Sequence, residues 1–259
     1  MPRPIVGSGR APFLPVMFEI PKAVDKTGKE GQLPDKWFTC ASKAYDFDSG
    51  EEFIAVATSE GRIYKLKEQV PGQFTKEIAF TMGIISPITT MISDAKSRHL
   101  LIGLGGGEIT LLKCSIDQQW DMINCEPSPN SYTHNPATCS DVLSLGLNMF
   151  VVGFASGTVR IYYCENGKEI CEIAAHSRQV NALVAHPTKQ VFASCSDDTF
   201  VNLWEVQGSK LDALNINLLL TSRVNDYQLT GIAFGKQTYS SIVCSVYDYK
   251  TMLVWDDVV

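Results

Sequence analysis

The sequence predicts an all-β protein that is built from one repeated unit. Three observations support this fold class. A short apolar run, a tight polar turn and a second run of alternating character recur along the chain, β-branched and aromatic residues are plentiful, and segments with a helical period are nearly absent. In the stretch TVRIYY, for example, Val159 and Ile161 share one face and Arg160 lies on the other, which is the period of a β-strand.

The repeated unit is a predicted β-hairpin, and the chain holds five copies of it. The copies cover residues 53–67, 99–113, 149–163, 191–206 and 241–256. Their turns lie at Gly61, Gly107, Gly157, Thr199 and Lys250, which are 46, 50, 42 and 51 residues apart. Turn sequences such as SEGR, GGGE and SDDT supply the backbone freedom that a hairpin needs.

Further apolar runs flank these hairpins. One run precedes each hairpin, at residues 38–44, 88–92, 141–145, 180–184 and 229–234, and another follows most of them, at 77–81, 120–123, 169–174 and 218–222. Four antiparallel strands at this spacing form one blade of a β-propeller. The predicted blades span residues 38–82, 87–125, 140–175, 176–222 and 229–259. A β-sandwich would need long Greek-key connections, and the spacing shows no sign of them.

The fourth unit carries the most specific pattern. From Ala175 it reads AHSRQVNALVAHPTKQVFASCSDDTFVNLWEV, and it resembles a blade of the WD-repeat family over its whole length. The resemblance implies a hydrogen-bonded set of histidine, serine, aspartate and tryptophan. The matching residues are His176, Ser194, Asp198 and Trp204. Ser196 is a second candidate for the hydroxyl. Such a set is physically reasonable, because a buried indole, imidazole and hydroxyl each need partners.

The other units depart from this pattern. Trp255 and Asp256 form a literal Trp-Asp dipeptide, but no histidine stands at the matching place ahead of them. In the first three units, the residues near the expected tryptophan are Tyr64, Leu111, and Tyr162 or Tyr163. We therefore expect apolar packing to hold these blades together.

Ring closure leaves two alternatives. We expect residues 1–12 to be a flexible N-terminal segment and residues 13–259 to form one propeller domain. The fifth hairpin has no strand after it, and the apolar run 13–20 can supply that strand, closing a five-bladed ring without an exposed sheet edge. The resemblance implies the alternative, a shortened seven-bladed type that lacks two blades and either closes as five or remains an open arc.

Charge, apolar runs and cysteine spacing argue against a nucleic-acid-binding, membrane-inserted or secreted protein. The net charge of −6 argues against a nucleic-acid partner, since binding to phosphates requires a basic surface. No stretch reaches ~18 apolar residues, so membrane insertion is not expected. The N-terminus has no hydrophobic core of a signal peptide. The eight cysteines are dispersed without a Cys-x-x-Cys pair, which indicates reduced thiols in a cytoplasmic protein.

Three groups of residues have the composition of a chemical site, and a structural interpretation is favoured for each. The run GLGGGE is followed by another strand and not by a helix, so a hairpin turn is favoured over a nucleotide site. His176, Ser194 and Asp198 are the residue types of a hydrolase triad, but no strand-to-helix turn surrounds Ser194. Cys125, His134 and Cys139 match no zinc module in their spacing. We expect no catalytic residue, no cofactor and no metal.

The segment 115–140 contains a long loop rich in proline, serine, threonine and asparagine. A solvated insertion between blades is the favoured interpretation. The alternative is a partner-binding or phosphorylated loop, because Ser128 lies between Pro127 and Pro129.

These observations predict a non-catalytic scaffold for protein–protein interaction in an intracellular complex, with no small-molecule substrate. The resemblance implies that partners bind the face that carries the loops before each first strand and between the second and third strands. The candidate contacts there are Arg178 and Asp197. One alternative is a structural subunit of a cytoskeletal, ciliary or trafficking assembly, in which a neighbour completes the propeller. A hydrolase or nucleotide-binding enzyme is a less favoured alternative.

Overall fold

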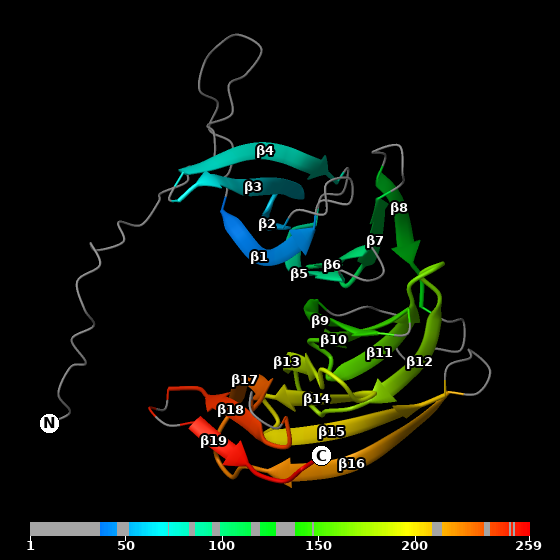
Figure 1. Ribbon diagram of the computed structural model, residues 1–259. Helices are drawn as coiled ribbons and strands as arrows, with labels where there is room; N and C mark the ends of the chain where they lie inside the picture. The colour runs from blue at the N-terminus through cyan, green and yellow to red at the C-terminus, as the bar shows by residue number, and fades with distance from the viewer. Residues whose placement is uncertain are drawn as a thin grey trace, which may run out of the picture.

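The computed structural model describes residues 37–45, 52–71, 73–82, 86–94, 99–114, 120–127, 138–146, 148–208, 214–235, 239–248, 250 and 252–259. Both the predicted flexible segment 1–12 and the predicted strand 13–20 lie outside these residues. Within them the secondary structure is entirely β, in five antiparallel sheets (Figure 1). The all-β prediction is confirmed.

The sheets follow the repeat. The first blade contains β1 (Phe38–Tyr45), β2 (Glu52–Thr58), β3 (Arg62–Val70) and β4 (Gln73–Thr81). The second contains β5 (Ile88–Asp94), β6 (His99–Leu104), β7 (Ile109–Cys114) and β8 (Trp120–Cys125). The third contains β9 (Cys139–Gly146), β10 (Met149–Phe154), β11 (Thr158–Tyr163) and β12 (Glu169–Ala174).

The last two blades differ in size. The fourth contains β13 (Val180–Ala185), β14 (Val191–Ser196), β15 (Phe200–Gln207) and β16 (Asn215–Arg223). The fifth contains β17 (Leu229–Phe234), β18 (Ile242–Val246) and β19 (Met252–Trp255), so it has three strands within the described residues. In every blade the strands pair in sequence order.

The blades are arranged around a common centre. Their innermost strands β1, β5, β9, β13 and β17 pack one against the next, and Figure 1 shows the first and fifth blades at the two ends of the resulting arc. The prediction of a five-bladed β-propeller is confirmed. The strand expected to close the ring lies outside the described residues.

Apolar packing between successive blades forms the core. A buried cluster fills each of the four junctions. The second strands β6, β10 and β14 are buried along their whole length, because both faces of an internal blade pack against a neighbour. Leu101 of β6 and Phe150 of β10, for example, are both 0% exposed and belong to one cluster. Burial of this kind is the main stabilising contribution to the fold.

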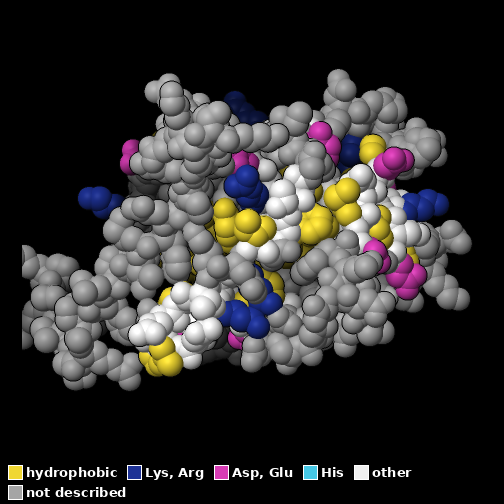
Figure 2. Space-filling view, turned by 90° about the horizontal axis from the view of Figure 1, so that it is seen from above, with side chains coloured by type: hydrophobic (Ala, Val, Ile, Leu, Met, Phe, Trp, Pro, Cys, Tyr) yellow, Lys and Arg dark blue, Asp and Glu magenta, His cyan; other side chains and the backbone are white. Residues whose placement is uncertain are grey.

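Some apolar side chains remain at the surface. Seen from above, the molecule presents hydrophobic side chains next to lysine or arginine and acidic side chains (Figure 2). The exposed apolar side chains include Ile78 on β4, Met122 on β8 and Met252 on β19.

Candidate functional site

The fourth blade brings together the four residues of the predicted hydrogen-bonded set. The indole Nε1–H of Trp204 donates to Ser194 Oγ at 3.1 Å, and Ser194 Oγ lies 2.8 Å from His176 Nε2. The other ring nitrogen, Nδ1, is 3.1 Å from both carboxylate oxygens of Asp198. Trp204 lies on β15, Ser194 on β14, His176 in the segment before β13 and Asp198 in the β14–β15 turn. The network therefore links two strands of the blade to two of its loops.

The directions of these hydrogen bonds follow from burial. Desolvation lowers the pKa of His176, and the Asp198 carboxylate opposes this shift only in part. A neutral imidazole then donates from Nδ1 to Asp198 and accepts the Ser194 hydroxyl proton at Nε2. The Ser194 oxygen in turn accepts from the indole, so every polar hydrogen in the chain has an acceptor.

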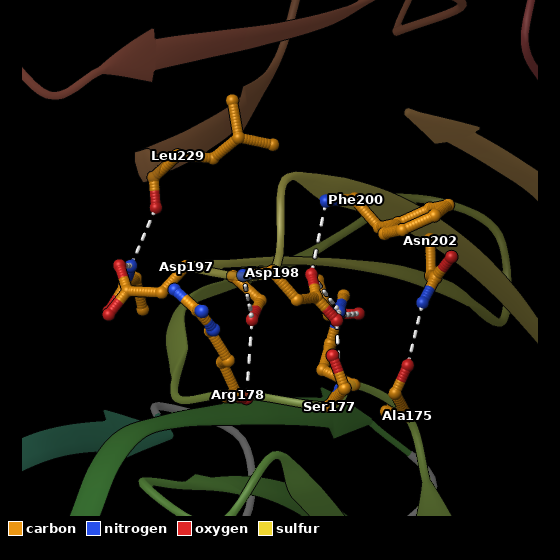
Figure 3. Close-up of polar contacts among 12 residues, drawn as sticks. Ala175, Ser177, Arg178, Asp197, Asp198, Phe200, Asn202 and Leu229 are labelled. Carbon is orange, nitrogen blue, oxygen red and sulfur yellow. Dashed lines mark hydrogen bonds and ion pairs between the residues drawn. The ribbon is translucent and has the colours of Figure 1, made fainter. Parts of the chain in front are cut away.

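Asp198 also organises the loops around the set. Its carboxylate accepts hydrogen bonds from the backbone N–H groups of Ser177 at 2.9 Å and Phe200 at 3.0 Å (Figure 3). The loop before β13 and the β14–β15 turn are therefore held to one buried carboxylate, whose side chain is 6% exposed. A buried charge that is fully hydrogen-bonded fixes local geometry, since breaking any one contact leaves it undersolvated.

Ser196 has a separate role from Ser194. Its hydroxyl donates to the carbonyl oxygen of Arg178 at 3.2 Å and accepts from the Asp198 N–H at 3.1 Å. The structure thus assigns the central position to Ser194. Because Ser194 is 0% exposed, a substrate cannot reach its hydroxyl, and the geometry is that of a structural network.

The neighbouring blade abuts this network through Gly157. Gly157 has φ +87°, and a Cβ there would lie 2.2 Å from the carbonyl oxygen of His176 and 2.6 Å from that of Arg178. The Gly157 carbonyl accepts a hydrogen bond from the His176 N–H at 3.0 Å. Glycine is thus required both by the backbone conformation and by the close approach of the third and fourth blades.

The two predicted contact residues differ in their surroundings. Arg178 is exposed at the loop before β13. Asp197 is half-buried, and its carboxylate accepts a 2.6 Å hydrogen bond from Asn181 Nδ2, which also donates to the Leu229 carbonyl at 2.7 Å. Asn181 thereby joins the fourth blade to the fifth. Asp197 is therefore part of a blade junction, which its sequence position beside Asp198 does not reveal.

The strand register identifies the residue at the tryptophan position of the other blades. Phe192 of β14 is paired with Trp204 of β15, and the equivalent pairs place Leu66, Leu112, Tyr162 and Trp255 at the tryptophan position. Tyr64 lies two residues before Leu66 on the same face of β3, whereas Leu111 lies one residue before Leu112 and points to the opposite face. Trp255 Nε1–H donates to Ser222 Oγ of the fourth blade at 2.9 Å. A serine of the neighbouring blade therefore accepts the indole hydrogen bond that the serine of the network accepts in the fourth blade.

Sequence reasoning missed a buried charge cluster in the third blade. Arg160 is 3% exposed, and its Nε lies 3.6 Å from Glu169 and 3.3 Å from Glu172 on the adjacent strand. Its guanidinium carbon is 5.2 Å from the ring centroid of Phe154. Arg160 and Tyr162 line a cavity of about 290 Å³ between the second and third blades. Alternation indicated only that Arg160 and Tyr162 share a face.

The glycine-rich run forms a β-hairpin. Gly105 to Glu108 connect β6 to β7, with Gly107 at φ +89°. A Cβ on Gly103 would lie 2.2 Å from Cys139 Sγ of the third blade. These glycines thus serve a turn and a close contact between blades.

The cysteine and histidine residues weighed as zinc ligands, and the long loop, lie partly outside the described residues, His134 and Ser128 included. Cys125 and Cys139 are buried, and burial raises the pKa of both thiols, that of Cys125 to about 12. Among the residues that the structure describes, no three histidine, cysteine or acidic side chains gather as a metal site would require. That same part of the chain has no helix long and apolar enough to span a membrane.

Sequence comparison identifies relatives of the chain. Residues 167–205 match the WD domain, G-beta repeat family. The chain is 26% identical over 219 residues to WD repeat-containing protein 54 of Mus musculus, covering 78% of this chain and 59% of the relative. WD repeat domain 54 of Rattus norvegicus is 26% identical over 112 residues, which cover 43% of this chain and 34% of the relative. The chain thus spans less than two thirds of each relative.

Solved structures share the fold. The β-propeller domain of Myceliophteria thermophila Cps50 (Swd1) superposes with a TM-score of 0.66 at 12% identity, covering 85% of this chain and 70% of that one. The computationally designed Ika8 protein gives a TM-score of 0.60 at 17% identity, with 85% of this chain and 58% of that one covered.

Proposed function

Because this chain is a five-bladed β-propeller that carries a WD repeat and is similar to WD repeat-containing protein 54, we propose that it is a non-catalytic scaffold for protein–protein interaction in an intracellular complex. WD-repeat propellers are generally scaffolds of this kind. The net charge of −6 favours a protein partner over nucleic acid. A cytoplasmic location remains our prediction.

The closed hydrogen-bond network of the fourth blade supports this proposal. Its polar atoms satisfy one another, and its serine is buried. The network instead holds the loop that carries Arg178, so this exposed cation is presented from a fixed backbone. A backbone that is already ordered adds no backbone entropy cost on binding, and arginine is enriched among interface anchors.

The proposal is tested by charge reversal on opposite ends of the propeller. Arg178→Glu reverses a charge before β13, whereas the control Lys168→Glu makes the same change in the β11–β12 turn, where Lys168 is also exposed. Each tagged full-length variant is purified from its native cells, and its partners are quantified by mass spectrometry. We expect Arg178→Glu to lose a specific partner that wild type and Lys168→Glu retain.

Two outcomes would contradict this view. Identical partners for both variants would exclude Arg178 as an anchor. The absence of any specific partner for the wild-type protein would remove the scaffold proposal itself. Circular dichroism of each variant separates a lost contact from a lost fold.

A second candidate function is that of a structural subunit whose propeller is completed by a neighbour. It is favoured by the apolar side chains exposed at the two ends of the arc, including Met252 at 72% and Ile54 at 42%.

A further inference from the structure

The outermost strand of the fourth blade has one edge that no other described strand covers. Within the described part of the chain, β16 pairs with β15 alone, and Figure 1 shows it at the outer side of its sheet. The N–H and C=O groups on the free edge of such a strand can pair with a further β-strand. The edge therefore favours an extended chain as its partner.

β16 lacks the residues that usually protect an edge strand. Charged side chains and proline on an edge strand hinder pairing with another chain. The outermost strands of the three other four-stranded blades contain charged residues, namely Lys76 and Glu77, Asp121, and Glu169 and Glu172. β16 reads NINLLLTSR, so Arg223 at its end is its one charged residue, and it has no proline. Leu218 and Leu219 on this strand are 49% and 46% exposed.

The hydrogen-bond pattern shows which backbone groups of β16 point outward. In an antiparallel pair, residues whose N–H and C=O groups point to the neighbouring strand alternate with residues whose groups point away. The Val224 N–H donates to the Thr199 carbonyl at 2.9 Å, just beyond the end of the β15–β16 pair. The backbone groups of Thr221 and Arg223 therefore point away from β15.

The same reasoning applies to the first half of β16. The Val206 N–H donates to the Gln190 carbonyl at 2.8 Å, so the backbone groups of Val206 point to the β14 side of β15. Val206 is paired with Ile216. The backbone groups of Ile216, and by alternation those of Leu218, therefore also point outward.

A β-bulge at Leu219 changes the spacing of these outward groups. Leu203 pairs with Leu220 and Trp204 pairs with Leu218, so Leu219 has no partner on β15. The outward groups therefore lie at positions 216, 218, 221 and 223. A regular β-strand presents such groups at every second residue, so it can match only one half of this edge.

A second copy of β16 in antiparallel orientation matches both halves. When position 216 of one copy lies opposite position 223 of the other, position 218 lies opposite position 221, and the irregular spacing is the same on both strands. We infer that the β16 edges of two copies of this chain pair antiparallel about a two-fold axis and form a homodimer. Leu219 of each copy then lies opposite Leu220 of the partner subunit, which buries apolar surface that is exposed in one copy alone.

This inference goes beyond the scaffold proposal and does not depend on it. Self-pairing uses the outer edge of the fourth blade, whereas the proposed anchor Arg178 lies in the loop before β13. Loss of one property therefore leaves the other intact.

Sedimentation equilibrium of the purified full chain over a range of concentrations tests the dimer. The test variant is Leu219→Lys, which places a charge at the centre of the paired edges. Met122→Lys is the matched control, because Met122 is an equally exposed apolar residue, at 45%, on the outermost strand β8 of the second blade.

We expect wild type and Met122→Lys to form a dimer whose population rises with concentration, and Leu219→Lys to raise the dissociation constant about tenfold or more. A wild-type protein that stays monomeric up to its solubility limit would overturn the inference. Equal dissociation constants for the three proteins would overturn it as well.

A proline variant tests the backbone contribution without adding a charge. Thr221→Pro removes an N–H group that points outward, a position at which an edge strand tolerates proline. We expect this variant to be a monomer with the circular dichroism spectrum of a β-protein. Should it fail to fold, the comparison of Leu219→Lys with Met122→Lys still decides the question.

Photo-cross-linking locates the contact. p-Benzoylphenylalanine is placed at position 219 or at the control position 122, and nitrogen-15-labelled and unlabelled chains are mixed so that cross-links between two copies carry both labels. We expect position 219 to cross-link to residues 215–223 of the other copy, and position 122 not to do so. Cross-links from position 219 to another segment would contradict the pairing of β16 edges. In native cells, a foreign peptide in place of the second copy would show that this edge binds a different protein and would also overturn the inference.

Discussion

Asp141 of β9 accepts a 2.7 Å hydrogen bond from the backbone N–H of Leu183 on β13, and so joins the third blade to the fourth. The same carboxylate accepts from the Val142 N–H at 2.9 Å and from the side chain of Thr90 on β5. One side chain thus contacts three successive innermost strands. Such a contact makes the blade junction sensitive to the protonation state of one group.

The first prediction concerns pH. Burial raises the pKa of Asp141 from 3.8 to about 6, so the folded protein holds this proton more tightly than the unfolded chain. The resulting stabilisation is fully present below pH 3.8 and is lost as the pH rises through about 6. Its size is roughly 3 kcal/mol at most, at about 1.4 kcal/mol for each pKa unit. Asp141→Asn should remove this pH dependence.

Urea denaturation of wild type and Asp141→Asn over this pH range measures the effect. The difference in unfolding free energy between the two proteins isolates Asp141 from other titrating groups. A difference that does not change with pH would contradict the prediction.

The second prediction concerns the buried serine. Ser194→Ala removes the acceptor of the Trp204 N–H and the partner of His176 Nε2, and leaves both nitrogens buried without a bond. We expect a loss of about 1–3 kcal/mol of unfolding free energy. Ser177→Ala is the control, because Ser177 is exposed and contributes to the site through its backbone N–H. Equal stability of the two variants in urea would rule out an energetic role for the network.

The third prediction concerns the tautomer of His176. At neutral pH we expect a neutral ring protonated on Nδ1, because burial lowers the pKa and Asp198 faces that nitrogen. Nitrogen-15 NMR of the imidazole distinguishes this form from the Nε2–H tautomer and from the imidazolium. Asp198→Asn should lower the pKa of His176 further, since the carboxylate charge raises it. An unchanged pKa of His176 in Asp198→Asn would show that the Asp198 carboxylate does not influence the protonation of the imidazole.

The fourth prediction separates backbone strain from steric contact. Gly157→Ala and Gly146→Ala both place an alanine at positive φ, +87° and +78° respectively. A Cβ on Gly157 would overlap the His176 carbonyl, whereas nothing lies within 4 Å of a Cβ on Gly146. Gly146→Ala should cost about 1 kcal/mol from conformation alone, and Gly157→Ala clearly more. Equal unfolding midpoints in urea would mean that the third and fourth blades are not in close contact at this point.

Much of the fold could be read from local pattern. Alternation with a period of two identifies the strands, and the recurrence of polar turns at intervals of 42 to 51 residues identifies the blades. The resemblance of the fourth repeat to a WD-repeat blade implied that His176, Ser194, Asp198 and Trp204 form one hydrogen-bonded set, and the structure contains these contacts. Tyr64 and Leu111 are near the tryptophan position, as expected, but the cross-strand register places Leu66 and Leu112 at the position itself.

The strands and their repeat follow from the sequence alone, and the hydrogen-bonded set of one blade follows from its family resemblance, because all of these depend on contacts within a single unit. Tertiary structure alone decided which residues join the blades. Asp141 contacts Leu183, and Asn181 contacts Leu229, across junctions whose geometry depends on how neighbouring sheets stack. It also decided that Met252 and Val254 face solvent although their equivalents are buried. Strand periodicity specifies which face a side chain occupies, but only the arrangement of whole sheets specifies what covers that face.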